Sequence, residues 1–234
     1  MSNLENYMKQ QAIFCEQNDS ISKNLYSEYG VKRGLRDEKG QGVLTGLTNI
    51  SDIKAFEYHD GVKSPCDGEL SYRGYNIKDL VTGSKGKRFV FEEGAYLLLF
   101  GELPTDTQLM EFQGRLSDCM ELPTNFTRDV IMKAPTSDIM GSMTRSILTL
   151  GSYDKEKESL EIPNVLRQSM QLIAVFPMLA VYAYHAYCHY EKNESMYIHR
   201  PEKDLSIAEN FLRLLRPDTK FTELEARVLD IALL

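Results

Sequence analysis

The stretch LIAVFPMLAVYAY, residues 172–184, decides the fold that we expect for this chain. It lies within a longer predicted helix, residues 164–190, whose first turns are amphipathic. From Leu172 to Tyr184 the segment is apolar on every side, and such a helix needs neighbours all round. Those neighbours are either the other helices of a monomeric bundle or a second copy of the protein. The periodicity alone leaves both alternatives open.

Most of the sequence from residue 76 onward has a helical pattern. Three predicted helix starts carry a capping box, in which a Ser or Thr and a Glu or Gln three residues later satisfy each other's backbone amides. These pairs are Thr105 with Gln108, Ser206 with Glu209, and Thr222 with Glu225. Proline follows the predicted helices 91–101, 106–122 and 207–216, as Pro104, Pro123 and Pro217. Short connections between these helices predict a mainly α bundle.

A further predicted helix, residues 137–150, has two different faces. One is an apolar stripe, and the other is kept small by Gly141, Ser142 and Ser146, so that a second helix can approach closely. The apolar stripe consists of Ile139, Met143, Ile147 and Leu150.

Residues 43–75 have a different pattern, in which Gly, Thr, Asn and Asp punctuate short apolar pieces. Asp67–Gly68 stands between candidate strands, and Asp-Gly is a favoured hairpin turn, so we expect a small antiparallel sheet or β meander here. Residues 1–42 are expected to hold helices over 4–17 and 21–29, followed by a Gly-rich, charged loop. The predicted domains are therefore 1–42, 43–75 and a helical portion, 76–234.

The last predicted helix is capped by Thr222, and its apolar positions run to Leu234 without a glycine, a basic last turn or another stop signal. A terminal carboxylate there opposes the helix dipole. We therefore expect the chain to end inside a helix that continues in a longer protein. The alternative is a natural terminus that docks on the core.

Composition excludes several classes of partner. The net charge is −7 and the Lys and Arg residues are scattered, so we expect no nucleic-acid and no anionic-membrane surface. The longest apolar run, of 13 residues, is too short for a bilayer span, which needs about 20. The chain shows no basic or apolar leader, and its cysteines lack framework spacing, which predicts reduced thiols and a cytoplasmic location. The cysteines are Cys15, Cys66, Cys119 and Cys188.

Motifs of catalysis or metal binding are nearly absent. His185, Cys188 and His189 have ligand-like spacing on one helix face, and His199 follows after a loop. Tyrosines interleave with them, which favours a helix end that passes from core to solvent, and we expect no metal and no cofactor. The acidic pairs Asp37–Glu38 and Glu92–Glu93 are interpreted as solvated charges.

A basic group lies in the Gly-containing loop near residue 33. Lys32, Arg33 and Arg36 could reach a phosphate, because a guanidinium binds phosphate oxygens in a two-pronged manner. The alternative is an ordinary solvated loop.

Several segments resemble the citrate synthase family, in its bacterial-type citrate and 2-methylcitrate synthases. GELSYRGYNIKDLV, residues 68–81, is similar to the family segment that precedes its first large helices, and FEEGAYLLLFGELPT, residues 91–105, resembles the helix and turn after it. Later similarities are PTSDIM (135–140), GSYD (151–154) and LIAVFP (172–177). The resemblance implies a citrate synthase-like helical bundle, the large-domain portion, and a homodimer packed through helices near 137–150 and 164–190.

The resemblance also implies an activity and its residues. Family members condense acetyl-coenzyme A with oxaloacetate, and YGVKRGL, residues 29–35, resembles the place where an arginine meets coenzyme A phosphate, which would be Arg33. The family's catalytic histidines and aspartate match positions beyond Leu234, so no catalytic residue is assigned in this chain. His59, His185, His189 and His199 match none of them.

Three functions follow as expectations. The first is the amino-terminal part of a citrate synthase, an acyltransferase, that is inactive alone. The second is the same part of a 2-methylcitrate synthase, which prefers propionyl-coenzyme A. The third, of another class, is a non-catalytic helical dimerisation module.

Overall fold

The structure is a computed structural model, and it describes residues 7, 11–13, 17, 22–32, 34–37, 39–43, 45–84 and 86–234. The chain divides into two compact units, Met1–Thr48 and Asn49–Leu234. The predicted division into 1–42, 43–75 and 76–234 stays a prediction.

The first unit contains helical residues and a tight loop. Helix α2, Asn24–Glu28, falls within the predicted helix 21–29. The loop closes through an antiparallel bridge between Arg36 and Gly42, and the Asp37 carboxylate accepts N–H groups inside it. Within the predicted helix 4–17 the structure describes only these residues, all helical: Tyr7, 11–13 and Gln17.

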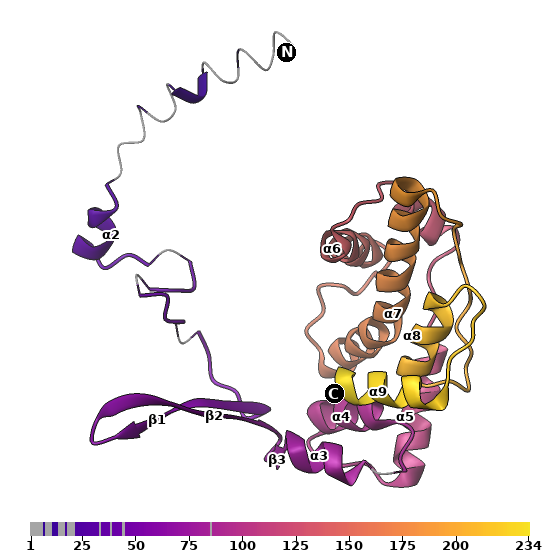
Figure 1. The fold of residues 1–234 in the computed structure, drawn as a ribbon, viewed down its shortest axis with the longest axis horizontal. Helices are drawn as coiled ribbons and strands as arrows, with labels where there is room; N and C mark the ends of the chain where they lie inside the picture. Colours follow the sequence, from indigo (N-terminus) through magenta and orange to yellow (C-terminus); the bar gives the residue numbers. More distant parts are fainter. Residues whose placement is uncertain are drawn as a thin grey trace. The chain divides into compact units, whose positions relative to one another are not determined.

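The second unit begins with a β-hairpin. Strand β1, Ser51–His59, pairs antiparallel with β2, Val62–Tyr72, and the short β3, Tyr75–Asn76, pairs with the end of β2. A small antiparallel sheet in the predicted region is thereby confirmed, and it extends one residue beyond residue 75, to Asn76. Its far end joins α3, Ile77–Gly83, which leads into the helices (Figure 1).

The hairpin turn is Asp60–Gly61, not Asp67–Gly68. Asp60 and Gly61 have φ values of 50° and 81°, the left-handed pair that a two-residue hairpin turn requires. The predicted turn at Asp67–Gly68 was wrong, because these residues lie inside β2, where the register with β1 shifts. Both pairs have the same local chemistry, and only the strand pairing distinguishes them.

Helices make up the remainder of the second unit, which confirms the mainly α fold. They are α4 (Val90–Phe100), α5 (Asp106–Asp118), the π-helical turn η1 (Thr127–Ile131), α6 (Ile139–Gly151), α7 (Ile162–Lys192), α8 (Ile207–Leu215) and α9 (Glu223–Leu233).

The three predicted capping boxes are confirmed, and they start α5, α8 and α9. In α5, for example, Gln108 N donates to Thr105 Oγ1 over 3.3 Å and Thr105 N donates to Gln108 Oε1 over 2.9 Å. This helix ends at Asp118, earlier than the predicted 122. The π-helical turn was not predicted, since no sequence signal separates it from an α-helical turn.

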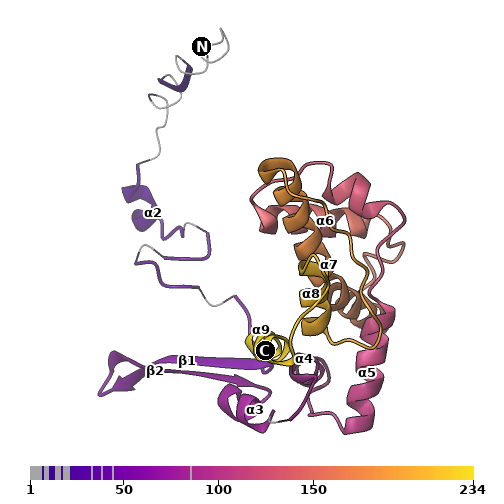
Figure 2. The ribbon, with the colours of Figure 1, turned by 45° about the vertical axis from the view of Figure 1, so that its right-hand side comes forward.

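Helix α7 is the centre of the core. By length and composition it is the one described helix that could cross a membrane, but its inward side is buried among the other helices, as in a core helix (Figures 1 and 2). Half of the buried hydrophobic core cluster comes from α7, and the rest from α5, η1, α8 and their connections. The cluster contains Phe112, Leu116, Met120, Phe126, Ile131, Ala174, Val175, Met178, Leu179, Val181, Tyr182, Ala183, Ile207 and Leu214.

Candidate functional site

The basic loop of the first unit surrounds a hollow of about 860 Å³, between α2 and residues 30–41. Arg33 itself lies outside the described residues. The hollow is lined by four cations, with Asp37 as the described carboxylate among its lining residues. Because this lining carries more positive than negative charge, it favours an anion. The four cations are Lys23, Lys32, Arg36 and Lys39.

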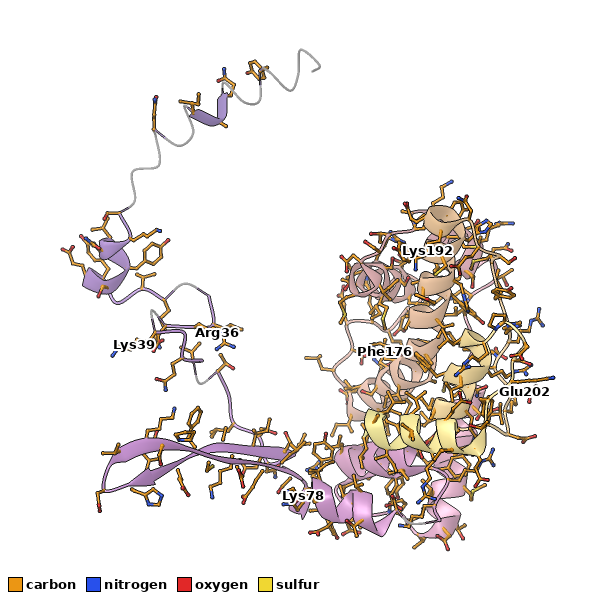
Figure 3. The ribbon with its side chains drawn as sticks, in the orientation of Figure 1. Arg36, Lys39, Lys78, Phe176, Lys192 and Glu202 are labelled. Carbon is orange, nitrogen blue, oxygen red and sulfur yellow. The ribbon has the colours of Figure 1, made fainter. Side chains whose placement is uncertain are left out.

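Hydrogen bonds within this loop hold the charged side chains of Arg36 and Asp37 in place. Arg36 Nη1 donates to the Gly40 carbonyl over 2.8 Å, and Asp37 Oδ1 accepts from Gln41 N over 2.8 Å. Arg36 and Lys39 are marked in Figure 3. The loop is therefore shaped by Arg36 and Asp37, and Lys32 sits beside it as a further lining cation.

The histidine cluster is part of the helix packing. Nε2 of His185 lies 3.0 Å from the Leu214 carbonyl oxygen, Nδ1 of His189 lies 2.7 Å from that of Glu194, and Nε2 of His199 lies 3.0 Å from that of Pro217. Each ring thus donates a proton to a backbone carbonyl. In the described part of the chain, no group of three His, Cys, Asp or Glu side chains could hold a metal ion. His185 and His189 connect α7 to the segments that follow it, and His199 connects the loop after α7 to Pro217, beyond α8.

The outer sides of α6 and α7 each carry exposed apolar side chains, and we call these two sides together the α6–α7 face. On α6, Met140 and Leu148 are each 73% exposed. On α7, Phe176 and Tyr184 are 42% and 41% exposed, although this part of the sequence predicts a helix with neighbours all round. Figure 3 shows Phe176 halfway along α7. The chain covers one side of α7 and leaves the other to solvent.

The small residues of α6, Gly141, Ser142 and Ser146, do not all lie on the α6–α7 face. Ser142 and Ser146 are buried, on the inner side of the helix. Gly141 N donates to Asp138 Oδ1 over 2.9 Å, and a Cβ at Gly141 would collide with that capping carboxylate. Gly141 is therefore explained by the helix cap, and it also lines a shallow hollow on the exposed side of α6.

The loop between α6 and α7 is tied down by Asp154. Its carboxylate accepts a hydrogen bond from Gln168 over 3.0 Å and from Arg167 over 2.8 Å, both on α7. These hydrogen bonds lower the pKa of Asp154 to about 2. The loop is consequently held in place on the first turns of α7.

Two carboxylates of α4 were misjudged from the sequence. Glu92 and Glu93 are 1% and 8% exposed, so their interpretation as solvated charges was wrong. Glu93 forms an ion pair of 2.8 Å with Lys87. Its burial has a sequence signal, because residues 90, 93, 94 and 97 follow the spacing of one buried helix face.

Buried carboxylates also hold the starts of two helices. Phe89 cannot cap α4 with its side chain, and instead Asp230 of α9 accepts hydrogen bonds from Val90 N and Phe91 N, each of 2.9 Å. Glu92 Oε1 accepts one from Ile207 N, at the start of α8, over 2.7 Å. Burial raises the pKa of Glu92 to about 7 and also raises that of Asp230. No sequence signal identifies such caps, since their partners are far apart in the chain.

Comparison with known proteins places this arrangement in one family. The family model described as "Citrate synthase, C-terminal domain" matches residues 35–234. A 2-methylcitrate synthase of Shewanella oneidensis is 31% identical over 166 residues, which cover 70% of this chain and 40% of that protein. A citrate synthase of Corynebacterium glutamicum is 30% identical over 149 residues, covering 63% of this chain and 32% of that protein.

Solved structures show the same fold. A citrate synthase from Pyrobaculum aerophilum matches with a TM-score of 0.65 at 24% identity, over 84% of this chain and 46% of that chain. A Thermoplasma acidophilum citrate synthase, solved with carboxymethyl-coenzyme A and oxaloacetate, matches with a TM-score of 0.64 at 21% identity, over 81% and 44%.

The mainly helical fold is thus of the citrate synthase type. With a family model matching most of its length, this chain belongs to the citrate synthase family. The matched region spans less than half the length of the relatives named above.

Proposed function

We propose that this chain provides the helical scaffold of an acyltransferase that joins acetyl-coenzyme A to oxaloacetate and forms citrate. The observation that carries the proposal is the family match over residues 35–234. The fold likeness to citrate synthase structures supports it, one of which was solved with a coenzyme A analogue and oxaloacetate.

The scaffold alone is proposed to be inactive. All four histidines of the chain are described, and three of them are bonded to backbone carbonyls around α7. The fourth, His59, lies exposed on the hairpin beside Glu57. None of these rings shares one of the hollows described above with a carboxylate that could act as a base, which proton abstraction next to a carbonyl requires.

A thioester-cleavage assay tests both statements. The purified 234-residue chain should give no turnover with acetyl-coenzyme A and oxaloacetate, while the product of the complete genomic reading frame should be active. A complete citrate synthase is the positive control. Turnover by the chain alone would contradict its inactivity, and an inactive product of a frame that extends past Leu234 would contradict the acyltransferase.

A 2-methylcitrate synthase is the second candidate, and the Shewanella relative of that name favours it. The two differ in the acyl group, so the ratio of kcat/KM for acetyl- and propionyl-coenzyme A with the complete protein decides between them. A ratio that favours propionyl-coenzyme A would replace citrate by 2-methylcitrate as the product.

Arg33 is proposed to contact a coenzyme A phosphate, supported by the cationic lining of the loop around it. Arg33→Ala should weaken coenzyme A binding by about 1.5–3 kcal/mol, typical for a hydrogen bond to a charged group. Arg128→Ala is a matched control, because within the described part of the chain this exposed arginine forms one ion pair, with its neighbour Asp129 across 2.6 Å. Calorimetry of the complete protein that gives equal losses for both variants would remove Arg33 from the site.

The α6–α7 face is proposed to be a homodimer interface, and its exposed apolar side chains support this.

The same face would serve a non-catalytic dimerisation module, which is the remaining candidate. A stop codon directly after Leu234 in the genomic reading frame would favour that module over the enzyme. For either protein we propose a cytoplasmic location.

A further inference from the structure

Three helices meet where the starts of α4 and α8 lie against α9. In both views α9 lies beside α4 and close to α8 (Figures 1 and 2). A hollow of about 300 Å³ opens there and is lined by residues of α8 and α9 and the segment before α4, among them Arg88, Glu209, Arg227 and Asp230. Carboxylates at the starts of helices are favourable, because they accept the unpaired N–H groups and face the positive end of the helix dipole.

Glu92 differs from the other carboxylates of this junction. Its Oε1 accepts the hydrogen bond from Ile207 N, but its buried Oε2 has no hydrogen-bond partner among the residues that the structure describes. By contrast, both oxygens of Asp230 are bonded, to Val90 N and Phe91 N. An ionised carboxylate with a buried, unbonded oxygen is costly, so this position favours the neutral form of Glu92 more than an exposed position would.

The charges around Glu92 add to this preference. From α9, Asp230 disfavours a second negative charge, and Glu209 of α8 does the same. Among the cations, Arg88 pairs with Glu209 across 2.7 Å, and Arg227 of α9 lines the hollow with its side chain 3.4 Å from the Ser84 carbonyl. Asp204 lies near Arg88 and accepts a hydrogen bond from it through its carbonyl.

The remaining elements packed on α4 bring little charge to Glu92. Lys87 pairs with Glu93, the next residue of α4. From α5, the uncharged Gln113 donates to the carbonyls of Lys203 and Leu205 just before α8. From β2 and the turn after it, the Tyr72 hydroxyl donates to an oxygen of the terminal carboxylate of Leu234 in this 234-residue chain, and Arg73 Nε donates to the Leu98 carbonyl near the end of α4. Arg88 is thus the cation whose field acts on Glu92, and it is already paired with Glu209.

We propose that Glu92 is a proton-binding switch at this junction: its neutral carboxyl holds the start of α8 against α4, and its ionised form loosens that contact. When the carboxyl is neutral, Oε1 accepts the Ile207 N–H without a buried charge. When it is ionised, the charge faces Asp230 and Glu209 in a buried space, and separation of α8 from α4 relieves it.

The sign of the pH dependence follows from the raised pKa. In the unfolded chain Glu92 loses its proton near its ordinary pKa of 4.5, whereas in the folded chain burial raises the pKa to about 7. Between these values the folded state holds a proton that the unfolded state lacks. Stability contributed by Glu92 is therefore present below about pH 4.5 and is lost as the pH rises toward 7.

The first experiment follows the melting temperature of the 234-residue chain from about pH 5 to pH 8. The melting temperature of the wild-type chain should fall as the pH rises over this range. The melting temperature of Glu92→Gln, which has nearly the same shape but cannot ionise, should fall less steeply. Glu111→Gln is the matched control, because Glu111 is an exposed glutamate that forms only a loose ion pair of 3.8 Å with Arg115 among the described residues. If Glu92→Gln and Glu111→Gln give the same pH profile as wild type, the switch is excluded.

A second experiment does not depend on a variant. Carbon-13 NMR of the glutamate side-chain carboxyls in the wild-type chain should show Glu92 titrating near pH 7, and a midpoint close to 4.5 would overturn the proposal. Hydrogen exchange reports the loosening itself. Above pH 7 the Ile207 amide, corrected for its intrinsic rate, should exchange faster in wild type than in Glu92→Gln, and equal rates would contradict the coupling to α8.

Discussion

The two sides of α7 have nearly the same apolar composition and opposite surroundings. On the inner side, Val175 and Leu179 are completely buried by the other helices of the chain. On the outer side, Phe176 and Tyr184 remain substantially exposed. Apolar composition therefore predicts that a side chain should be buried, but the packing of the other helices determines which side of α7 is buried within this chain. The outer side is the part for which we propose a second copy.

The largest effect on folding should come from the inner side. Leu179→Ala leaves a cavity at a fully buried position, so we expect a loss of about 2–5 kcal/mol in the free energy of unfolding, measured with urea. Leu148→Ala on the exposed side of α6 is the matched control and should cost less than about 0.5 kcal/mol at a concentration where the chain is monomeric. Equal losses at both positions would remove the distinction between the two sides.

A smaller loss in the free energy of unfolding is expected where a buried carboxylate caps a helix. Asp230→Ala deprives Val90 N and Phe91 N of their acceptor, and buried donors without a partner cost about 1–3 kcal/mol. Asp118→Ala is a suitable control, because this aspartate forms an exposed ion pair with Lys203, a kind of pair with a typical value of about 0–1 kcal/mol. A loss for Asp230→Ala no larger than that of the control, by urea unfolding, would show that α4 needs no cap from α9.

A smaller effect is expected at the local cap of α9. Thr222→Ala removes the acceptor of the Glu225 N–H bond of 3.2 Å, and the loss of such a cap costs about 1 kcal/mol. Thr222→Ser keeps the hydroxyl and should stay near wild type. If both variants lose the same stability, then the methyl group of Thr222, and not its hydroxyl, matters.

The smallest effect on the monomer should come from the outer side of α7. Phe176→Ser exchanges a partly exposed side chain for a polar one, and in dilute solution the free energy of unfolding should change by about 1 kcal/mol or less. Thermal unfolding at several protein concentrations separates this change in monomer stability from loss of association, since dimerisation makes the melting temperature concentration-dependent. A large, concentration-independent loss would mean that Phe176 belongs to the core of the monomer.

The sequence predicts those parts of the fold that depend on neighbouring residues. The capping boxes of α5, α8 and α9 are confirmed, because each joins two residues within one helical turn. The hairpin turn was assigned to the wrong Asp-Gly pair, since strand pairing and not local chemistry selects Asp60–Gly61.

The candidate sites were less predictable. Burial of Glu92 depends on α8 and α9, which lie far away in the sequence, and no local pattern announces the hydrogen bond from Ile207. Ligand-like spacing of His185 and His189 was a weaker guide than their surroundings, where backbone carbonyls accept their ring protons. The role of Arg33 stays a prediction.

The most direct test of the contrast between the two sides of α7 is sedimentation equilibrium of the 234-residue chain, alongside a variant carrying Phe176→Glu and Leu148→Glu. We expect the wild-type chain to sediment as a dimer and the variant, with charges on the α6–α7 face, as a folded monomer. A wild-type chain that remains monomeric at every concentration, or a variant that dimerises equally well, would contradict the account.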